Sequence, residues 1–169
     1  EACEYRDHLL ELSPEVLVIT NVEWDHTDWF KKEKEVVETF REAAQKVPED
    51  GAVVASLSQP LATEVVQEIR AGIIDYSGEN IPLLQVPGEF NKENARAAVA
   101  AARAWNPNLD EEAMKESLAL FTGTWRRFEY KGVTAKGALV YDDYAHHPTA
   151  VQATLDAAHA LMDQGVFRY

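Results

Sequence analysis

Residues 15–20 read Glu-Val-Leu-Val-Ile-Thr, a short run of aliphatic, mostly β-branched side chains. Such a run is typical of a strand that is buried on both faces. A polar loop, residues 21–28, follows it directly. Residues 31–47 then carry apolar side chains at helical spacing, with lysine and glutamate on the other faces. The stretch therefore predicts a buried strand, a polar loop and an amphipathic helix, in that order.

The alternation of strand and helix continues along the chain. After the turn at Asp50-Gly51, residues 52–55 predict a second strand. A helix over 60–70, which opens with Pro60, leads to a third strand at 73–76. Strands and helices in this order predict an α/β fold with a largely parallel sheet.

The pattern changes after residue 80. The further elements that we expect are a strand at 81–86, helices at 91–105 and 110–121, strands at 128–130 and 138–141, and a helix that begins at Pro148. We place a domain boundary near Thr124, so that residues 1–123 belong to one domain and residues 124–169 begin a second.

Composition limits the classes of partner. The chain has 29 acidic and 16 basic side chains and a net charge of −13. This charge argues against a general binder of nucleic acid or of anionic membranes, whose phosphates it would repel. The single cysteine, Cys3, excludes an internal disulfide framework and fits a reducing compartment. With no targeting signal and no apolar stretch of about 20 residues, we expect a cytoplasmic protein.

Two polar clusters follow predicted strands. Residues 20–28 place asparagine, glutamate, aspartate and histidine where the first strand ends, and these side chains suit a divalent cation. Residues 142–148 place paired aspartates and histidines before the last helix, where they could hold a ribose, a metal or phosphate oxygens. The alternatives are an ordinary polar loop for the first cluster and a helix cap for the second.

A third cluster, residues 121–129, contains Arg126 and Arg127 between aromatic side chains. Paired arginines in an acidic chain form a local positive patch, which could bind phosphates in a bidentate manner. The alternative is a pair of surface ion pairs that contribute little to stability.

Five motifs, in this order and at this spacing, resemble those of the Mur ligase family. They cover nearly the whole chain: Glu1-Ala2-Cys3-Glu4-Tyr5, Thr20-Asn21-Val22-Glu23-Trp24-Asp25-His26, Gly88-Glu89-Phe90-Asn91-Lys92-Glu93-Asn94-Ala95, Phe121-x-Gly-x-x-Arg-Arg-Phe-Glu129 and Asp142-Asp143-Tyr144-Ala145-His146-His147-Pro148-Thr149. The family consists of ATP-dependent enzymes that add amino acids or peptides to UDP-N-acetylmuramate in peptidoglycan synthesis.

The resemblance implies a particular domain arrangement. Residues 1–123 would be the later part of a central, mostly parallel-sheet ATPase domain, and residues 124–169 the first β/α elements of a Rossmann-like C-terminal domain. The family's Gly-Lys-Thr/Ser phosphate loop and its UDP-binding domain would lie upstream of Glu1. We therefore expect this chain by itself to lack ligase activity.

The resemblance also implies roles in catalysis and metal binding. Glu1 and His26 match the family's magnesium ligands, and Arg127 matches an arginine that reaches the phosphates of ATP. His26 and Arg127 are thus the candidate catalytic residues. Arginine and Mg²⁺ offset the negative charge on a phosphoryl group in transfer.

Further residues match nucleotide contacts. Asn91 and Asn94 match asparagines that face the adenine, to which an amide can offer both a donor and an acceptor. Asp143 matches a carboxylate that contacts the nucleotide from the C-terminal domain, and His146 lies beside it without an assigned role. We expect Glu1 with His26 and Arg127 with Asp143 to meet on one bound Mg–ATP.

The implied reaction transfers a phosphoryl group from ATP to the carboxylate of UDP-N-acetylmuramate, and an amine then attacks the acyl phosphate. The amine is L-alanine or, in a relative, a recycled tripeptide. Residues 10–17 resemble the alanine-adding branch of the family, whereas Ala145 and Ala150 resemble the tripeptide-adding branch, and we favour L-alanine. Phe90 stands where the family usually has histidine, and Cys3 stands where aspartate is common.

Two other classes of function stay open. One is a regulatory nucleotide-binding module without chemistry, which a parent protein lacking the phosphate loop would indicate. The other is a metal-dependent hydrolase built on Asp25, His26, Asp142 and His146, which would release phosphate from simple esters without an amine.

Overall fold

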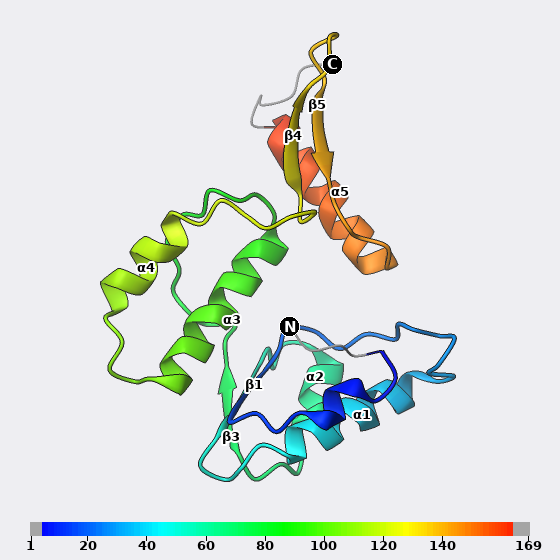
Figure 1. Ribbon diagram of the computed structural model, residues 1–169, viewed down its shortest axis with the longest axis vertical. Coiled ribbons are helices and arrows are strands. Elements are labelled where there is room, and N and C mark those ends of the chain that lie inside the picture. Colours follow the sequence, from blue (N-terminus) through cyan, green and yellow to red (C-terminus); the bar gives the residue numbers. More distant parts are fainter. Residues whose placement is uncertain (1–4, 164–169) are drawn as a thin grey trace. The chain divides into compact units, whose positions relative to one another are not determined.

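The structure, a computed structural model, describes residues 5–163, which separate into two units (Figure 1). Of the described residues, those up to Asn80 together with Glu93–Asp110 form the first unit. Ile81–Lys92 and the residues from Glu111 onward form the second unit. Each unit is described by itself below.

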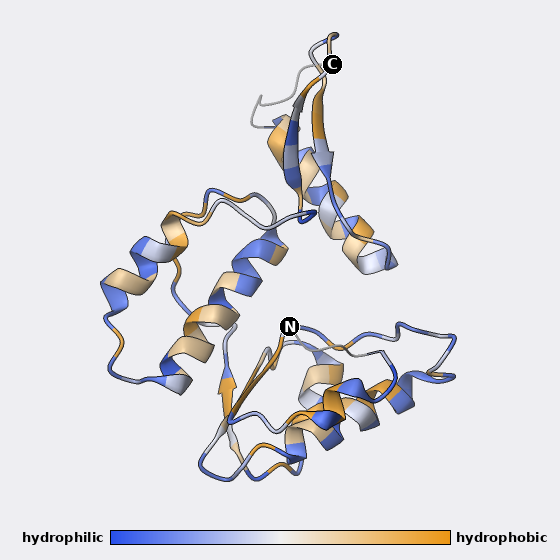
Figure 2. Ribbon diagram, viewed as in Figure 1, coloured by the Kyte–Doolittle hydropathy of each residue, from blue (hydrophilic) through white to orange (hydrophobic). Residues whose placement is uncertain are grey.

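The first unit is built on a parallel sheet in the order β1-β2-β3. Its strands are β1 (Val16–Ile19), β2 (Ala52–Ala55) and β3 (Gly72–Asp75). The 3₁₀ helix η1 (His8–Glu11) precedes β1, and the helices α1 (Glu33–Gln45) and α2 (Pro60–Val65) connect successive strands. Figure 2 shows hydrophobic residues in β1 and β3; Ile19 at the end of β1 is buried, whereas β3, at the edge of the sheet, is mostly exposed.

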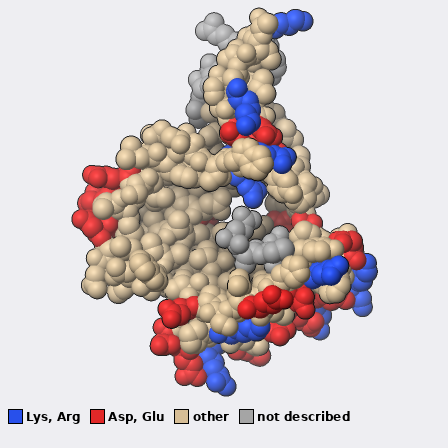
Figure 3. Space-filling view, in the orientation of Figure 1, with Lys and Arg blue, Asp and Glu red and all other residues tan. Residues whose placement is uncertain are grey.

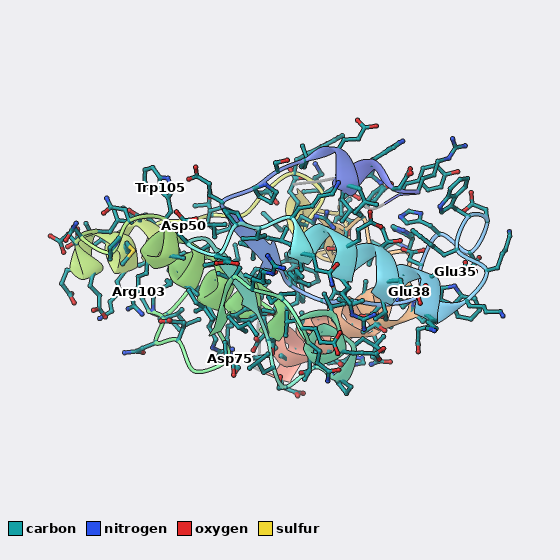
Figure 4. All side chains as sticks on the ribbon, turned by 90° about the horizontal axis from the view of Figure 1, so that it is seen from below. Glu35, Glu38, Asp50, Asp75, Arg103 and Trp105 are labelled. Atoms are coloured by element: carbon teal, nitrogen blue, oxygen red, sulfur yellow. The ribbon has the colours of Figure 1, made fainter. Side chains whose placement is uncertain are left out.

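Successive side chains of β2 point to opposite faces of the sheet and pack in two separate hydrophobic clusters. Val53 packs in one cluster with Val37 of α1 and with residues of α2, whereas Val54 packs with Ala97 of α3 (Glu89–Trp105). Successive side chains of a strand point to opposite faces, so helices are required on both. The exposed side of α1 is polar, and Figure 4 shows Glu35 and Glu38 on this helix. Lys34 pairs with Glu38 at 3.3 Å.

The second unit contains a helix, a hairpin and a final helix. α4 (Glu111–Ala119) precedes the antiparallel strands β4 (Glu129–Val133) and β5 (Leu139–Asp142). α5 (Pro148–Asp163) follows and runs beside the hairpin in Figure 1. None of the helices described between residues 5 and 163 is long and apolar enough to span a membrane.

The predicted fold class is confirmed: the structure is mixed α/β with a parallel sheet. The expected strand at 81–86 is wrong, because this segment pairs with no strand among the described residues. Pro82 lacks the backbone N–H that a ladder requires. Gln85 instead donates from Nε2 to the carbonyl of Ala119 at 2.8 Å. The division at residues 123 and 124 stays a prediction.

Tyr76, directly after β3, is fully buried and secures the end of β1. Its hydroxyl donates to the carbonyl of Thr20 at 2.8 Å, and the same carbonyl accepts from Nε2 of Gln59 at 3.0 Å. Burial, and to a smaller degree the charges of Glu93 and Asp75, raise the pKa of Tyr76. The polar loop that follows Thr20 is therefore attached to the core of the first unit.

Replacing Tyr76 with phenylalanine is expected to lower the free energy of unfolding by about 1 kcal/mol. The loss is modest because Gln59 still satisfies the Thr20 carbonyl. A raised pKa in the folded state stabilises the fold below about pH 10, the ordinary tyrosine value, and this contribution is lost as pH rises through the folded pKa. Urea unfolding at neutral and alkaline pH should show the parent losing more stability than Tyr76→Phe. An equal alkaline loss in both proteins would contradict the assignment.

Candidate functional site

The loop after β1 holds His26 in an unusual backbone conformation. His26 has a φ of 50°, in the left-handed region that non-glycine residues seldom adopt. Its N–H donates to Oδ1 of Asp25 at 2.6 Å. Its carbonyl accepts from the N–H groups of Trp29 and Phe30 at 2.8 and 2.9 Å. Hydrogen bonds of both the N–H and the carbonyl of His26 therefore fix the backbone from which its imidazole projects.

Tyr5 connects the start of the described chain to this turn. Its ring lies edge-on to the imidazole of His26, with 5.2 Å between the centroids. Its hydroxyl donates to Oδ2 of Asp28 at 2.8 Å, and this hydrogen bond is the largest influence lowering the pKa of Asp28. The guanidinium of Arg6 lies 5.0 Å from the ring centroid of Trp29. Several side-chain contacts thus join Tyr5 and Arg6 to the loop of His26.

The structure describes only one of the two predicted metal ligands, His26. Glu1 lies outside the described residues, so its pairing with His26 stays a prediction. Between residues 5 and 163, no group of three His, Cys, Asp or Glu side chains could hold a metal ion. Mg²⁺ is usually bound by one or two carboxylates and completes its shell with water and phosphate oxygens. His26 as a metal ligand stays a prediction, and the described residues do not supply a complete site.

The two predicted adenine contacts lie three residues apart near the start of α3, a spacing that puts them on one side of the helix. Asn91 is half-buried and donates from Nδ2 to the carbonyl of Pro87 at 2.6 Å, whereas Asn94 is exposed. Gly88, with a φ of 97°, makes the turn into the helix. The ring of Phe90 packs over this glycine, since a Cβ there would lie 2.5 Å from the ring.

A cavity of about 430 Å³ lies within the second unit. Two chain segments and the hairpin form its wall: Gln85, Val86, Pro87, Thr122, Gly123, Thr124, Trp125, Arg127, Phe128, Glu129, Tyr130 and Tyr141. Phe128 and Tyr141 stack with centroids 4.6 Å apart, which gives the wall a flat aromatic surface. This combination of aromatic rings with one guanidinium suits a planar ligand that carries negative charge.

The predicted phosphate-binding arginine lies in a turn with two left-handed residues. Arg126 and Phe128, on either side of Arg127, have φ values of 54° and 50°. The N–H of Arg126 donates to Oε2 of Glu129 at 2.9 Å, and its carbonyl accepts from the N–H of Tyr144 at 2.9 Å. The N–H of Phe128 donates to Oδ2 of Asp143 at 2.6 Å. The turn that carries Arg127 is therefore fastened to the strand end that carries Asp143.

Tyr144 is an aromatic surface shared by several predicted site residues. The guanidinium carbons of Arg126 and Arg127 lie 4.9 and 5.8 Å from its ring centroid. The imidazole of His146 lies edge-on to the same ring at 5.2 Å, and its Nδ1 is 3.0 Å from the Tyr144 carbonyl. Arg126 also pairs with Asp142 at 3.6 Å. Figure 3 shows basic side chains gathered with acidic ones at the base of the hairpin.

The structure thus brings three of the predicted residues, Arg127, Asp143 and His146, together in the second unit. His26 and Asn94 belong to the first unit. The roles carried over to all of these residues stay predictions. Sequence reasoning did not single out Tyr144 or Thr154. Tyr144 could have been found from its place between Asp143 and His146, whereas Thr154 lies on a helix without a comparable signal.

Comparison with protein families places two models on the chain. The Mur ligase middle domain matches residues 2–82, and the glutamate ligase domain of Mur ligases matches residues 126–167. A UDP-N-acetylmuramate–L-alanine ligase of Desulfitobacterium hafniense is 38% identical over 94% of this chain and 40% of its own length. The enzyme of the same name from Caldanaerobacter subterraneus is 36% identical with the same coverage of both chains. The chain spans about 40% of the length of these relatives.

Solved structures share the fold. MurF from Acinetobacter baumannii matches with a TM-score of 0.75 at 21% identity, over 95% of this chain and 41% of its own. UDP-N-acetylmuramate–alanine ligase from Thermotoga maritima matches with a TM-score of 0.70 at 23% identity and the same coverage. A folylpolyglutamate synthase/dihydrofolate synthase from Yersinia pestis, complexed with AMPPNP and Mn, has a TM-score of 0.69 at 21% identity, over 96% of this chain and 43% of its own.

Proposed function

Because the chain belongs to the Mur ligase family, we propose that it is part of an ATP-dependent ligase that joins L-alanine to UDP-N-acetylmuramate. The observation that carries this proposal is the cavity of the second unit, where Arg127 lies among aromatic rings. The names of the relatives that match 94% of the chain support the choice of reaction. We propose the cytoplasm as its location.

The cavity supports ATP as the nucleotide. An adenine can stack on an exposed aromatic ring of the wall, Trp125 or Tyr130, and the guanidinium of Arg127 can pair with phosphate oxygens. Asn91 uses Nδ2 to bind the Pro87 carbonyl, and its Oδ1 and second amide hydrogen take no part in that bond. We propose that these groups and Asn94 face the adenine, and that Asp143 and His146 lie next to the nucleotide.

In the reaction that we propose, the γ-phosphoryl group of ATP passes to the carboxylate of UDP-N-acetylmuramate and ADP leaves. The amine of L-alanine then attacks the carbonyl of the acyl phosphate and expels phosphate. Arg127 would stabilise the charge that spreads over the phosphoryl oxygens. We propose that Glu1 and His26 hold Mg²⁺, which supplies charge neutralisation at the phosphates.

The test is an assay of the full-length protein with ATP and UDP-N-acetylmuramate. ADP release that depends on both the sugar nucleotide and L-alanine, with one phosphate per amide formed, would support the proposal. Release that depends on a tripeptide instead would assign the recycling reaction. ATP binding without turnover would indicate a regulatory module, and phosphate release from simple esters without an amine would indicate a hydrolase.

A further inference from the structure

We infer that Asp143 and Thr154 are positioning residues, which hold the backbone of residues 126–128 in the conformation that presents Arg127. The inference rests on the proposed function for its effect on ATP use. It concerns contacts that exist within the protein itself, before any nucleotide binds.

The carboxylate of Asp143 is engaged by three donors of the protein. Oδ2 accepts from the N–H of Phe128 at 2.6 Å, and Oδ1 accepts from the N–H of Ala145 at 2.7 Å. The hydroxyl of Thr154 lies 3.2 Å from Oδ1 and 2.9 Å from the carbonyl of Ala150, so its hydrogen is shared between two acceptors. The side chain thus joins the turn before β4, the loop after β5 and the helix α5.

The turn requires such support because its backbone is strained. In residues other than glycine, the side chain crowds its own backbone when φ is positive, and Arg126 and Phe128 both have a positive φ. Two hydrogen bonds reach the turn from neighbouring residues of one strand end: Tyr144 donates to the carbonyl of Arg126, and Asp143 accepts from Phe128. Arg127 lies between these two attachment points, so their geometry determines where its side chain starts.

These contacts assign Asp143 a positioning function in addition to its proposed place next to the nucleotide. A carboxylate has about four acceptor positions, and three donors from the protein already face this one. A change at Asp143 therefore acts on ATP through the placement of Arg127. Thr154 acts in the same way, since its hydroxyl helps to orient the carboxylate.

The first test measures hydrogen–deuterium exchange by mass spectrometry in the full-length protein without ATP. Asp143→Asn keeps one acceptor oxygen but loses the charge and one of the two acceptors. We expect the amides of Phe128 and Ala145 to exchange about tenfold faster in this variant. Asp156→Asn is the matched control, because Asp156 lies on α5 and accepts from Gln152 at 2.7 Å, outside this network. Parent-like exchange in Asp143→Asn would overturn the inference.

The second test compares Thr154→Val with Thr154→Ser, which keeps the hydroxyl. We expect the valine variant to raise the KM for ATP about fivefold and to speed exchange at Phe128 and Ala145, with the serine variant within about twofold of the parent. Equal behaviour of the two variants would overturn the inference. This comparison tests the positioning role even if Asp143→Asn fails to fold.

The exchange measurement separates this inference from the proposed function. If the protein shows no ligase activity, the exchange rates without ATP still show whether Asp143 holds the turn. If Asp143→Asn abolishes ATP use while the exchange of Phe128 and Ala145 stays unchanged, Asp143 contacts the nucleotide directly and the inference is wrong.

Discussion

Replacing His26 with alanine in the full-length protein is expected to reduce Mg²⁺-dependent formation of the acyl phosphate by about 100-fold or more. Residues that only orient a metal ligand already change activity by 10- to 100-fold, so the loss of a ligand should cost at least as much. The fold should survive, because the imidazole is half-buried and lies outside the hydrophobic core of the first unit. ADP release measured across a range of Mg²⁺ concentrations checks the prediction.

The backbone at His26 calls for a second variant. Alanine at a φ of 50° carries a strain of about 1 kcal/mol, which could disturb the loop by itself. Glycine adopts the left-handed region freely and offers no side-chain oxygen to a cation, so His26→Gly removes the imidazole while retaining the turn. Both variants should lose activity, and His26→Gly should unfold close to the urea concentration of the parent. Activity within twofold of the parent in either variant would refute the metal assignment.

Replacing Arg127 with alanine is expected to lower turnover by about 100- to 1,000-fold, the usual effect of removing one donor that stabilises transition-state charge. The binding of UDP-N-acetylmuramate should change little, because Arg127 lines the cavity that we assign to the nucleotide. Steady-state kinetics with varied ATP, together with calorimetric binding of the sugar nucleotide, separate the two effects. Unchanged affinity and turnover for ATP would count against the assignment.

Two further variants show what the arginine contributes. Arg127→Lys keeps the positive charge but not the planar fork, so we expect partial recovery. Lys115→Ala removes a cation of the same unit, on α4, that pairs with Glu111 at 3.1 Å and does not line the cavity. This control should stay within about twofold of the parent if the effect belongs to Arg127 rather than to net charge.

The order of the elements could be predicted because each depends on local patterns. The strand at 15–20 appears as β1 and the strand at 52–55 as β2, since aliphatic runs of that length suit buried parallel strands. The strand predicted at 81–86 does not form. The aliphatic residues of this segment suggested a strand, although Pro82 cannot donate a hydrogen bond to a ladder. The strands expected at 128–130 and 138–141 form, but their antiparallel pairing depends on contacts that the separate runs do not specify.

The candidate site could be predicted only as a set of residues. Arg127, Asp143 and His146 stood out as charged or imidazole groups beside predicted strands, and the structure brings them together. Tyr144 did not stand out, although both arginines and His146 contact its ring. An aromatic residue at a strand end is common in many folds, and only the folded chain shows which side chains contact it.

By itself, the sequence determined the α/β class, the succession of strands and helices and a set of candidate residues for binding a charged nucleotide, because hydropathy and side-chain chemistry are local properties. The tertiary structure alone decided the left-handed turn at Arg126 and Phe128 and its attachment to Asp143. That turn is unfavourable for the segment in isolation. It forms because hydrogen bonds from residues far along the chain offset its strain, and such bonds exist only after folding.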